Sequence, residues 1–193
     1  MTKSQRPRPR GVIELVDEPS RHEPLSSVAG IGAVESFEDF YRRELPRLLV
    51  LARALAGDLA AEDVAQESML VAYRQWARIA ALTSPTGYVR GICAHKAVSL
   101  VRRRLSEGRA VRRLANRPMS AVGPLDGEGE RFWAEVRRLP RRQAQVTALF
   151  YALDLPVSEV AVTLGCAEGT VKVHLSRARS ELATRLGTTE EPS

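Results

Sequence analysis

The sequence contains little cysteine, few aromatic residues and no long hydrophobic run. Its two cysteines, Cys93 and Cys166, lie far apart in the 193 residues, and neither has a second thiol at metal-binding spacing. This argues against both a disulfide framework and a zinc site. No apolar stretch approaches the roughly 20 residues of a membrane-spanning helix, so no membrane insertion is expected. Residues 1–10 precede no apolar stretch that would mark a secretory signal, and a cytoplasmic location is predicted by default.

The sequence also lacks the residue groupings of an active site. Its three histidines, His22, His95 and His174, lie in different segments, and no catalytic Ser/His/Asp or Cys/His set or phosphate-binding loop is visible. We therefore expect a protein that is not an enzyme and needs no cofactor or metal. Lysine and arginine number 29 against 23 acidic residues, giving a formal charge of +6 that favours an anionic partner.

Composition divides the chain into segments. Residues 1–34 are rich in Pro, Arg, Ser and Gly, which predicts a disordered tail. Beyond them, apolar residues recur three and four apart, which is helical periodicity. We predict an all-α protein with two small helical domains, residues 35–105 and 130–187. Frequent Gly and Pro over residues 106–129 indicate a flexible linker, and residues 188–193 form a second tail.

The first domain is expected to begin with two helices. One runs from Phe37 to Leu55, and Pro46 within it predicts a kink or break. The second is expected from about residue 59 to 76, with Asp58 as its N-cap and the side chain of Tyr73 toward the core.

Two further patterns locate the remaining helices. Ser84-Pro85 marks the start of a helix that should end near Leu105, with a capping hydroxyl followed by proline in the first turn. In the second domain, short helices over residues 157–164 and 168–186 flank the turn Gly165-Cys166-Ala167. This spacing predicts a helix-turn-helix.

Charge is distributed unevenly in the first domain. Residues 35–67 contain four basic and eight acidic side chains, a balance of −4, whereas residues 68–105 contain seven basic and no acidic ones. Such a domain is expected to contact a protein with its acidic part and nucleic acid with its basic part.

Two motifs in this order carry a family resemblance. The first is the segment from Asp58-Leu-Ala-Ala-Glu62-Asp63 to Tyr73-Arg74, and the second combines Leu139-Pro140, Glu159-Val-Ala161, Gly169-Thr170-Val171-Lys172 and Arg177-Ala178-Arg179. With both motifs, the chain resembles the extracytoplasmic-function (ECF) sigma factors of bacterial RNA polymerase. The resemblance implies an alternative-type sigma factor for stress-responsive, promoter-specific initiation of transcription.

The resemblance also implies partners. Core RNA polymerase is expected to bind through its beta-prime clamp helices and its beta flap, and the residues assigned to the clamp helices are Asp58, Glu62, Asp63, Gln66, Glu67 and Leu70. Promoter DNA is the second expected partner, and an anti-sigma protein is a third, since such sigma factors are commonly held by one.

The residues assigned to promoter DNA form two groups. Melted DNA is held by aromatic side chains and a positive groove, which favours Arg78, Tyr88, Arg90, His95, Lys96, Ser99, Arg102 and Arg103. His95 could equally be structural. The helix-turn-helix should read the duplex upstream with the first turns of its second helix, which assigns Thr170, Lys172, Val173, His174, Ser176 and Arg177. Val171, Leu175 and Ala178 are expected in the core.

One alternative from another functional class stays open at this point. A stand-alone helix-turn-helix regulator that does not bind core polymerase would explain the second domain equally well. It would leave the acidic helix and the basic part of the first domain without a role.

Overall fold

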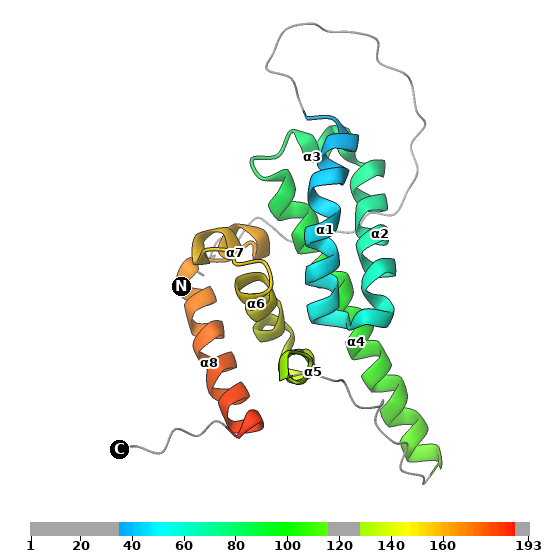
Figure 1. Cartoon of the computed structure of the whole chain (residues 1–193), viewed down its shortest axis with the longest axis vertical. Helices are drawn as coiled ribbons and strands as arrows, with labels where there is room; N and C mark the ends of the chain where they lie inside the picture. Colours follow the sequence, from blue (N-terminus) through cyan, green and yellow to red (C-terminus); the bar gives the residue numbers. More distant parts are fainter. Residues whose placement is uncertain (1–34, 116–127, 188–193) are drawn as a thin grey trace, which may run out of the picture. The chain divides into compact units, whose positions relative to one another are not determined.

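The structure, a computed structural model, describes residues 35–115 and 128–187. Eight helices and no strand are found in this part of the chain (Figure 1), which confirms the all-α prediction. The predicted tails and residues 116–127 of the predicted linker lie outside the described residues. None of the helices described here combines the length and hydrophobicity that a membrane crossing requires.

Helix α1 (Phe37–Ala56) runs through Pro46 as one helix, so the break that was one of the two predicted outcomes is absent. The Oγ of Ser36 caps its N-terminus by accepting a hydrogen bond from the amide of Asp39 at 3.1 Å. A proline inside a helix costs about 3 kcal/mol. Leu48 and Leu51 follow it and are fully buried, and each buried leucine stabilises the helix in place by roughly 1.5 to 3 kcal/mol.

Helix α2 (Asp58–Arg74) follows directly, and the short helix α3 (Trp76–Ala80) comes after it. Asp58 is not the N-cap that we predicted. Gly57 occupies that position with φ of +80°, and no side chain caps the helix. The Asp58 carboxylate instead forms an ion pair with the Nε of Arg53 at 2.6 Å, which links the end of α1 to the start of α2.

Helix α4 (Pro85–Ala115) begins where Ser84-Pro85 predicts. The Oγ of Ser84 accepts a hydrogen bond from the backbone amide of Gly87 at 3.1 Å. The helix does not end near Leu105, because the residues that follow are mostly good helix formers. An ion pair between Arg103 and Glu107, at 2.8 Å, supports this continuation one turn apart.

Helices α1, α2 and α4 pack side by side (Figure 1). Their shared core includes Leu51, Met69 and Val89, each at most 2 % exposed. One ion pair is buried among these apolar side chains. Glu44 of α1 accepts a hydrogen bond from the Nε of Arg90 of α4 at 3.0 Å and forms an ion pair with its Nη2 at 2.9 Å. Glu44 and Arg90 are 1 % and 5 % exposed. This pair ties α1 to α4.

The remaining helices are α5 (Glu128–Arg138), α6 (Arg141–Tyr151), α7 (Val157–Leu164) and α8 (Glu168–Leu186). The last two have the bounds that the sequence predicts. Gly165 turns the chain between them in the left-handed region, at φ of +62°, a conformation that glycine adopts without steric cost. The core side of α8 is confirmed, because its buried residues include Val171, Leu175 and Ala178.

The two cysteines are expected to differ in reactivity. Burial raises the pKa of the Cys93 thiol to about 12, so only about one thiol in ten thousand is ionised at pH 8. Cys166 lies half-buried in the turn before α8. We expect Ellman's reagent to modify one thiol in the folded protein and the second only in urea. Rapid modification of both thiols without denaturant would contradict this.

Candidate functional site

The residues assigned to polymerase lie on one exposed face of α2. Glu62, Asp63, Gln66, Glu67 and Leu70 are all exposed, at spacings that place them on successive turns. Glu62 accepts a hydrogen bond from the Nε2 of Gln66 at 2.9 Å, and Glu67 forms an ion pair with Lys96 of α4 at 3.0 Å. Among the described residues, Asp63 enters no salt bridge, so its carboxylate is available to a cation on another molecule.

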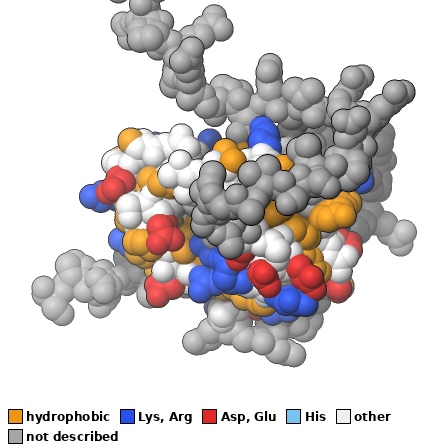
Figure 2. All heavy atoms as spheres, turned by 90° about the horizontal axis from the view of Figure 1, so that it is seen from above, with side chains coloured by type: hydrophobic (Ala, Val, Ile, Leu, Met, Phe, Trp, Pro, Cys, Tyr) orange, Lys and Arg blue, Asp and Glu red, His pale blue; other side chains and the backbone are white. Residues whose placement is uncertain are grey.

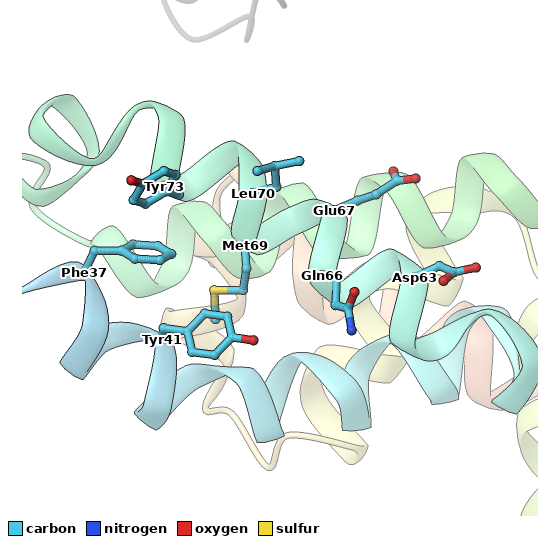
Figure 3. A pocket seen from close by; sticks show the side chains of 8 residues that line it. All are labelled: Phe37, Tyr41, Asp63, Gln66, Glu67, Met69, Leu70 and Tyr73. Atoms are coloured by element: carbon cyan, nitrogen blue, oxygen red, sulfur yellow. The ribbon is translucent and has the colours of Figure 1, made fainter. Parts of the chain in front are cut away.

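A shallow groove runs beside this face, between α1 and α2 (Figure 3). Phe37 and Tyr41 of α1 form one wall, and the α2 wall comprises Asp63, Gln66, Glu67, Met69, Leu70 and Tyr73. The ring centroids of Phe37 and Tyr73 are 5.1 Å apart. The groove thus combines an aromatic end with an acidic and amide end, as the side chains of Figure 3 show.

The sequence did not identify the α1 wall as part of this site. Phe37 matched the core periodicity of its helix, and nothing in the spacing of Tyr41 relates it to α2. Tyr73 was also misplaced: we expected it toward the core, but it is 63 % exposed. Only the packing of α1 against α2 brings these rings together.

The basic part of the first domain lies on α3 and α4. Arg78 of α3 donates to the hydroxyl of Tyr88 at 2.8 Å, and its guanidinium lies over that ring, 5.6 Å from the centroid. This fixes the connection between the two helices. Arg90 lies elsewhere than expected, because its guanidinium is buried against Glu44. The structure corrects its assignment to DNA: Arg90 holds α1 and α4 together.

The other assigned residues of α4 are accessible. His95, Ser99, Arg102 and Arg103 are exposed, and Lys96 is partly so. Burial lowers the pKa of His95, and the positive charges of Arg141, Arg142 and Lys96 lower it further. Burial and the charges of Arg142 and Arg102 likewise lower the pKa of Arg141. Cations from α4 and α6 therefore gather near one another.

Helix α8 presents most of its assigned residues outward. Thr170, Lys172, Val173, Ser176 and Arg177 are exposed, opposite the buried side of the helix. His174 differs, because it is only half-exposed and its Nδ1 is buried without a hydrogen-bond partner among the described atoms. At most its Nε2 edge is available to a ligand. Ala167 precedes the helix and provides no side-chain cap.

Acidic and basic side chains are mixed on one face of the molecule. Figure 2 shows the end at which α3 lies in Figure 1, where acidic, basic and hydrophobic side chains are interspersed. Several cations of the first domain are neutralised locally, as in the pairs of Arg90 with Glu44 and Lys96 with Glu67. Ion pairing thus reduces the charge asymmetry that the sequence alone suggests.

Two family models and a known protein match the sequence of this chain. The family model of sigma-70 region 2 matches residues 40–107, and that of sigma-70 region 4 matches residues 129–182. The ECF RNA polymerase sigma factor SigM of Mycobacterium tuberculosis is 28 % identical over 194 residues, with 94 % of each chain covered. The chain belongs to the ECF sigma factors. It is therefore an alternative sigma factor, of the class of transcription initiation factors.

Solved structures of other sigma factors share the fold. The sigma factor RpoE of Bartonella quintana, crystallised with the anti-sigma factor NepR, matches with a TM-score of 0.59 and 24 % identity, covering 80 % of this chain and 98 % of RpoE. CnrH in complex with the cytosolic domain of CnrY matches with a TM-score of 0.55 and 20 % identity, covering 80 % and 89 %.

The residues assigned to polymerase and to DNA all lie within the two matched regions. Region 2 includes the exposed face of α2, the α2 wall of the groove and the basic face of α4. Region 4 includes α6, α7 and the outward face of α8. Phe37 lies just ahead of the region 2 match, so the groove extends beyond the segment that the family model describes.

Proposed function

We propose that this sigma factor binds core RNA polymerase through the exposed face of α2 and the groove beside it, with the beta-prime clamp helices as the partner. The supporting observation is Asp63, which is exposed and unpaired among the described residues, next to an aromatic groove. A helix with basic side chains could place a cation against Asp63 and apolar atoms against Leu70 and Tyr73. Such complementarity sets both the rate and the specificity of binding.

The promoter-opening role in this proposal belongs to α4. Tyr88, His95, Lys96, Ser99, Arg102 and Arg103 offer an aromatic ring, polar groups and cations for unstacked bases and their phosphates. Arg78 contributes mainly by fixing Tyr88. Arg90 has no part, because it is buried.

The third role is reading of the upstream promoter element by α8. A recognition helix enters the major groove with its N-terminal residues at the base edges. Lys172, Val173, Ser176 and Arg177 are exposed in the first three turns of α8. In this proposal residues 35–105 and 130–187 act as two functional domains, and the beta flap of polymerase positions the second.

An anti-sigma protein is the remaining proposed partner. RpoE and CnrH, which share this fold, were each solved in complex with an anti-sigma partner. The groove between α1 and α2 and the cationic face of α4 are surfaces that such a protein would have to cover to block polymerase and DNA.

The proposed function can be tested with purified components. The sigma factor is mixed with sigma-free core RNA polymerase, the mixture is separated by size exclusion, and transcripts are mapped on fragmented genomic DNA. We expect co-elution and new discrete start sites. DNA binding without co-elution would instead indicate a stand-alone regulator.

Replacing Arg177 with alanine is expected to weaken binding to the upstream element by about 1 to 3 kcal/mol, the range for a bidentate contact to guanine. Fluorescence anisotropy with the element mapped above measures this change. Arg131→Ala is the matched control, because Arg131 is exposed on α5, outside the helix-turn-helix. Equal affinities of the two variants would remove the base-reading role of Arg177.

A further inference from the structure

The groove between α1 and α2 has the chemistry of a site for a segment that is both basic and apolar. Among the described residues, its lining includes the carboxylates of Asp63 and Glu67 and no lysine or arginine. At the other end lie the rings of Phe37 and Tyr73 (Figure 3), and Tyr73 is 63 % exposed. Exposed aromatic rings gain free energy when apolar side chains cover them, and they also attract cations.

The sequence contains one segment with this combination, at residues 3–16. Its first eight residues hold four cations and no acid, and its last six hold four apolar side chains and one acid. The cations are Lys3, Arg6, Arg8 and Arg10, and the apolar residues are Val12, Ile13, Leu15 and Val16. These are the two kinds of side chain that we propose on the clamp helices, so the segment complements the groove in charge and in apolar character.

The order of the two parts along the chain matches the order of the two ends of the groove. Helix α1 begins at Phe37, so the chain enters this helix at the aromatic end. Counting back from Phe37, the apolar residues 11–16 come before the basic residues 3–10. A segment laid along the groove from the aromatic end therefore brings its apolar part to the rings and its cations to Asp63.

The chain is long enough for this return. Residues 17–34 connect the segment to the residues before α1, and 18 residues span up to about 60 Å when extended. The part of α2 from Asp63 to Tyr73 extends over only about 15 Å. Joining a ligand to its site in one chain gives it an effective concentration on the order of millimolar. Contacts of sub-millimolar affinity are therefore enough to fill the groove.

We infer that residues 3–16 occupy the groove between α1 and α2 in the free sigma factor and compete there with core RNA polymerase. This inference rests on the proposed role of the groove. Polymerase must displace the segment, so its apparent affinity is reduced to the fraction of molecules in which the groove is open. The segment thereby regulates how strongly this sigma factor binds core polymerase.

Crosslinking in the full chain tests occupancy directly. The photoreactive amino acid p-benzoylphenylalanine replaces Leu15, the protein is irradiated without polymerase, and the products are digested and identified by mass spectrometry. We expect a product of monomer size that joins position 15 to the peptides of α1 and α2 that line the groove. A product that joins two chains would instead place the segment on a second copy.

Val12→Ser, Ile13→Ser is the variant that tests competition without changing charge. We expect less crosslinking to the groove and about three- to tenfold tighter binding of core polymerase, as measured by titration of labelled polymerase. This range corresponds to a groove that is filled in about two-thirds to nine-tenths of the parent molecules. Val28→Ser, Ile31→Ser makes the same change within residues 17–34 and should match the parent in both measurements.

The basic part of the segment is tested separately. Arg6→Glu, Arg8→Glu, Arg10→Glu brings negative charge to the acidic end of the groove, where like charges repel. We expect this variant to lose most of the crosslink. The matched control Arg6→Lys, Arg8→Lys, Arg10→Lys keeps the positive charge and should retain the crosslink.

Three results would overturn the inference. They are the absence of a groove product in the free chain, a product that joins two chains, and equal polymerase affinities of the parent and Val12→Ser, Ile13→Ser. The crosslink is measured without polymerase and does not depend on the proposed function. Failure of the proposed function would appear differently, as unchanged polymerase binding when Asp63 itself is replaced with arginine.

Discussion

Replacing Arg90 with alanine is expected to lower the free energy of unfolding by about 3 kcal/mol, the lower end of the range for breaking a buried ion pair. The substitution leaves the carboxylate of Glu44 buried at 1 % exposure without the hydrogen bond and the ion pair that Arg90 provides. Arg43 also reaches Glu44 from the surface, and this remaining cation keeps the loss at the lower end. Urea unfolding followed by circular dichroism measures the change.

Two further variants separate the ion pair from general effects of the substitution. The double variant Glu44→Met, Arg90→Met removes both charges and should recover most of the lost stability, because the uncompensated charge rather than the missing attraction dominates the cost. Arg42→Ala removes an exposed partner of Glu38 and should change stability by less than about 0.5 kcal/mol. A loss for Arg90→Ala as small as that for Arg42→Ala would contradict the prediction.

The helices of this sigma factor could be predicted well from its sequence, because each one buries a face at regular spacing. Ser84-Pro85 located the start of α4, and Gly165 located the turn before α8. The errors arose where tertiary packing outweighs a local signal. Pro46 should interrupt α1, but the helix continues because its next turns are buried between α2 and α4. Asp58 has the chemistry of an N-cap, yet a neighbouring arginine binds it instead.

The candidate sites were predicted less completely, for a related reason. Counting charges identifies Arg90 as one of seven cations in a segment without acids, and only the fold shows that Glu44 of a distant segment neutralises it. The groove beside α2 likewise needs Phe37 and Tyr41 from α1. Exposed residues on a single helix, such as those of α2 and α8, were predictable because helical spacing alone determines which of them share a face.

The double variant Asp63→Arg, Gln66→Ala is expected to weaken binding of core RNA polymerase on the order of 100-fold. Asp63 is unpaired among the described residues and lies at the acidic end of the groove, where an arginine would meet the basic side chains that we propose on the partner. Like charges at an interface cost several kcal/mol, and loss of a desolvated charge pair costs about 2 to 5 kcal/mol, which corresponds to a factor of that size or more.

The fold should tolerate this double variant. Both side chains are exposed, and exposed substitutions usually change stability by no more than about 0.5 kcal/mol. Glu107→Arg is a matched charge reversal at an exposed position of α4 that does not line the groove, and it should bind polymerase like the parent chain. Titration of labelled core polymerase gives the three affinities, and an unfolding curve for each variant confirms its stability. If the folded double variant bound as tightly as Glu107→Arg, the α2 face would not be the polymerase-binding surface. An isolated cluster of acids that merely keeps α2 soluble predicts that equality, whereas a docking face predicts a selective loss.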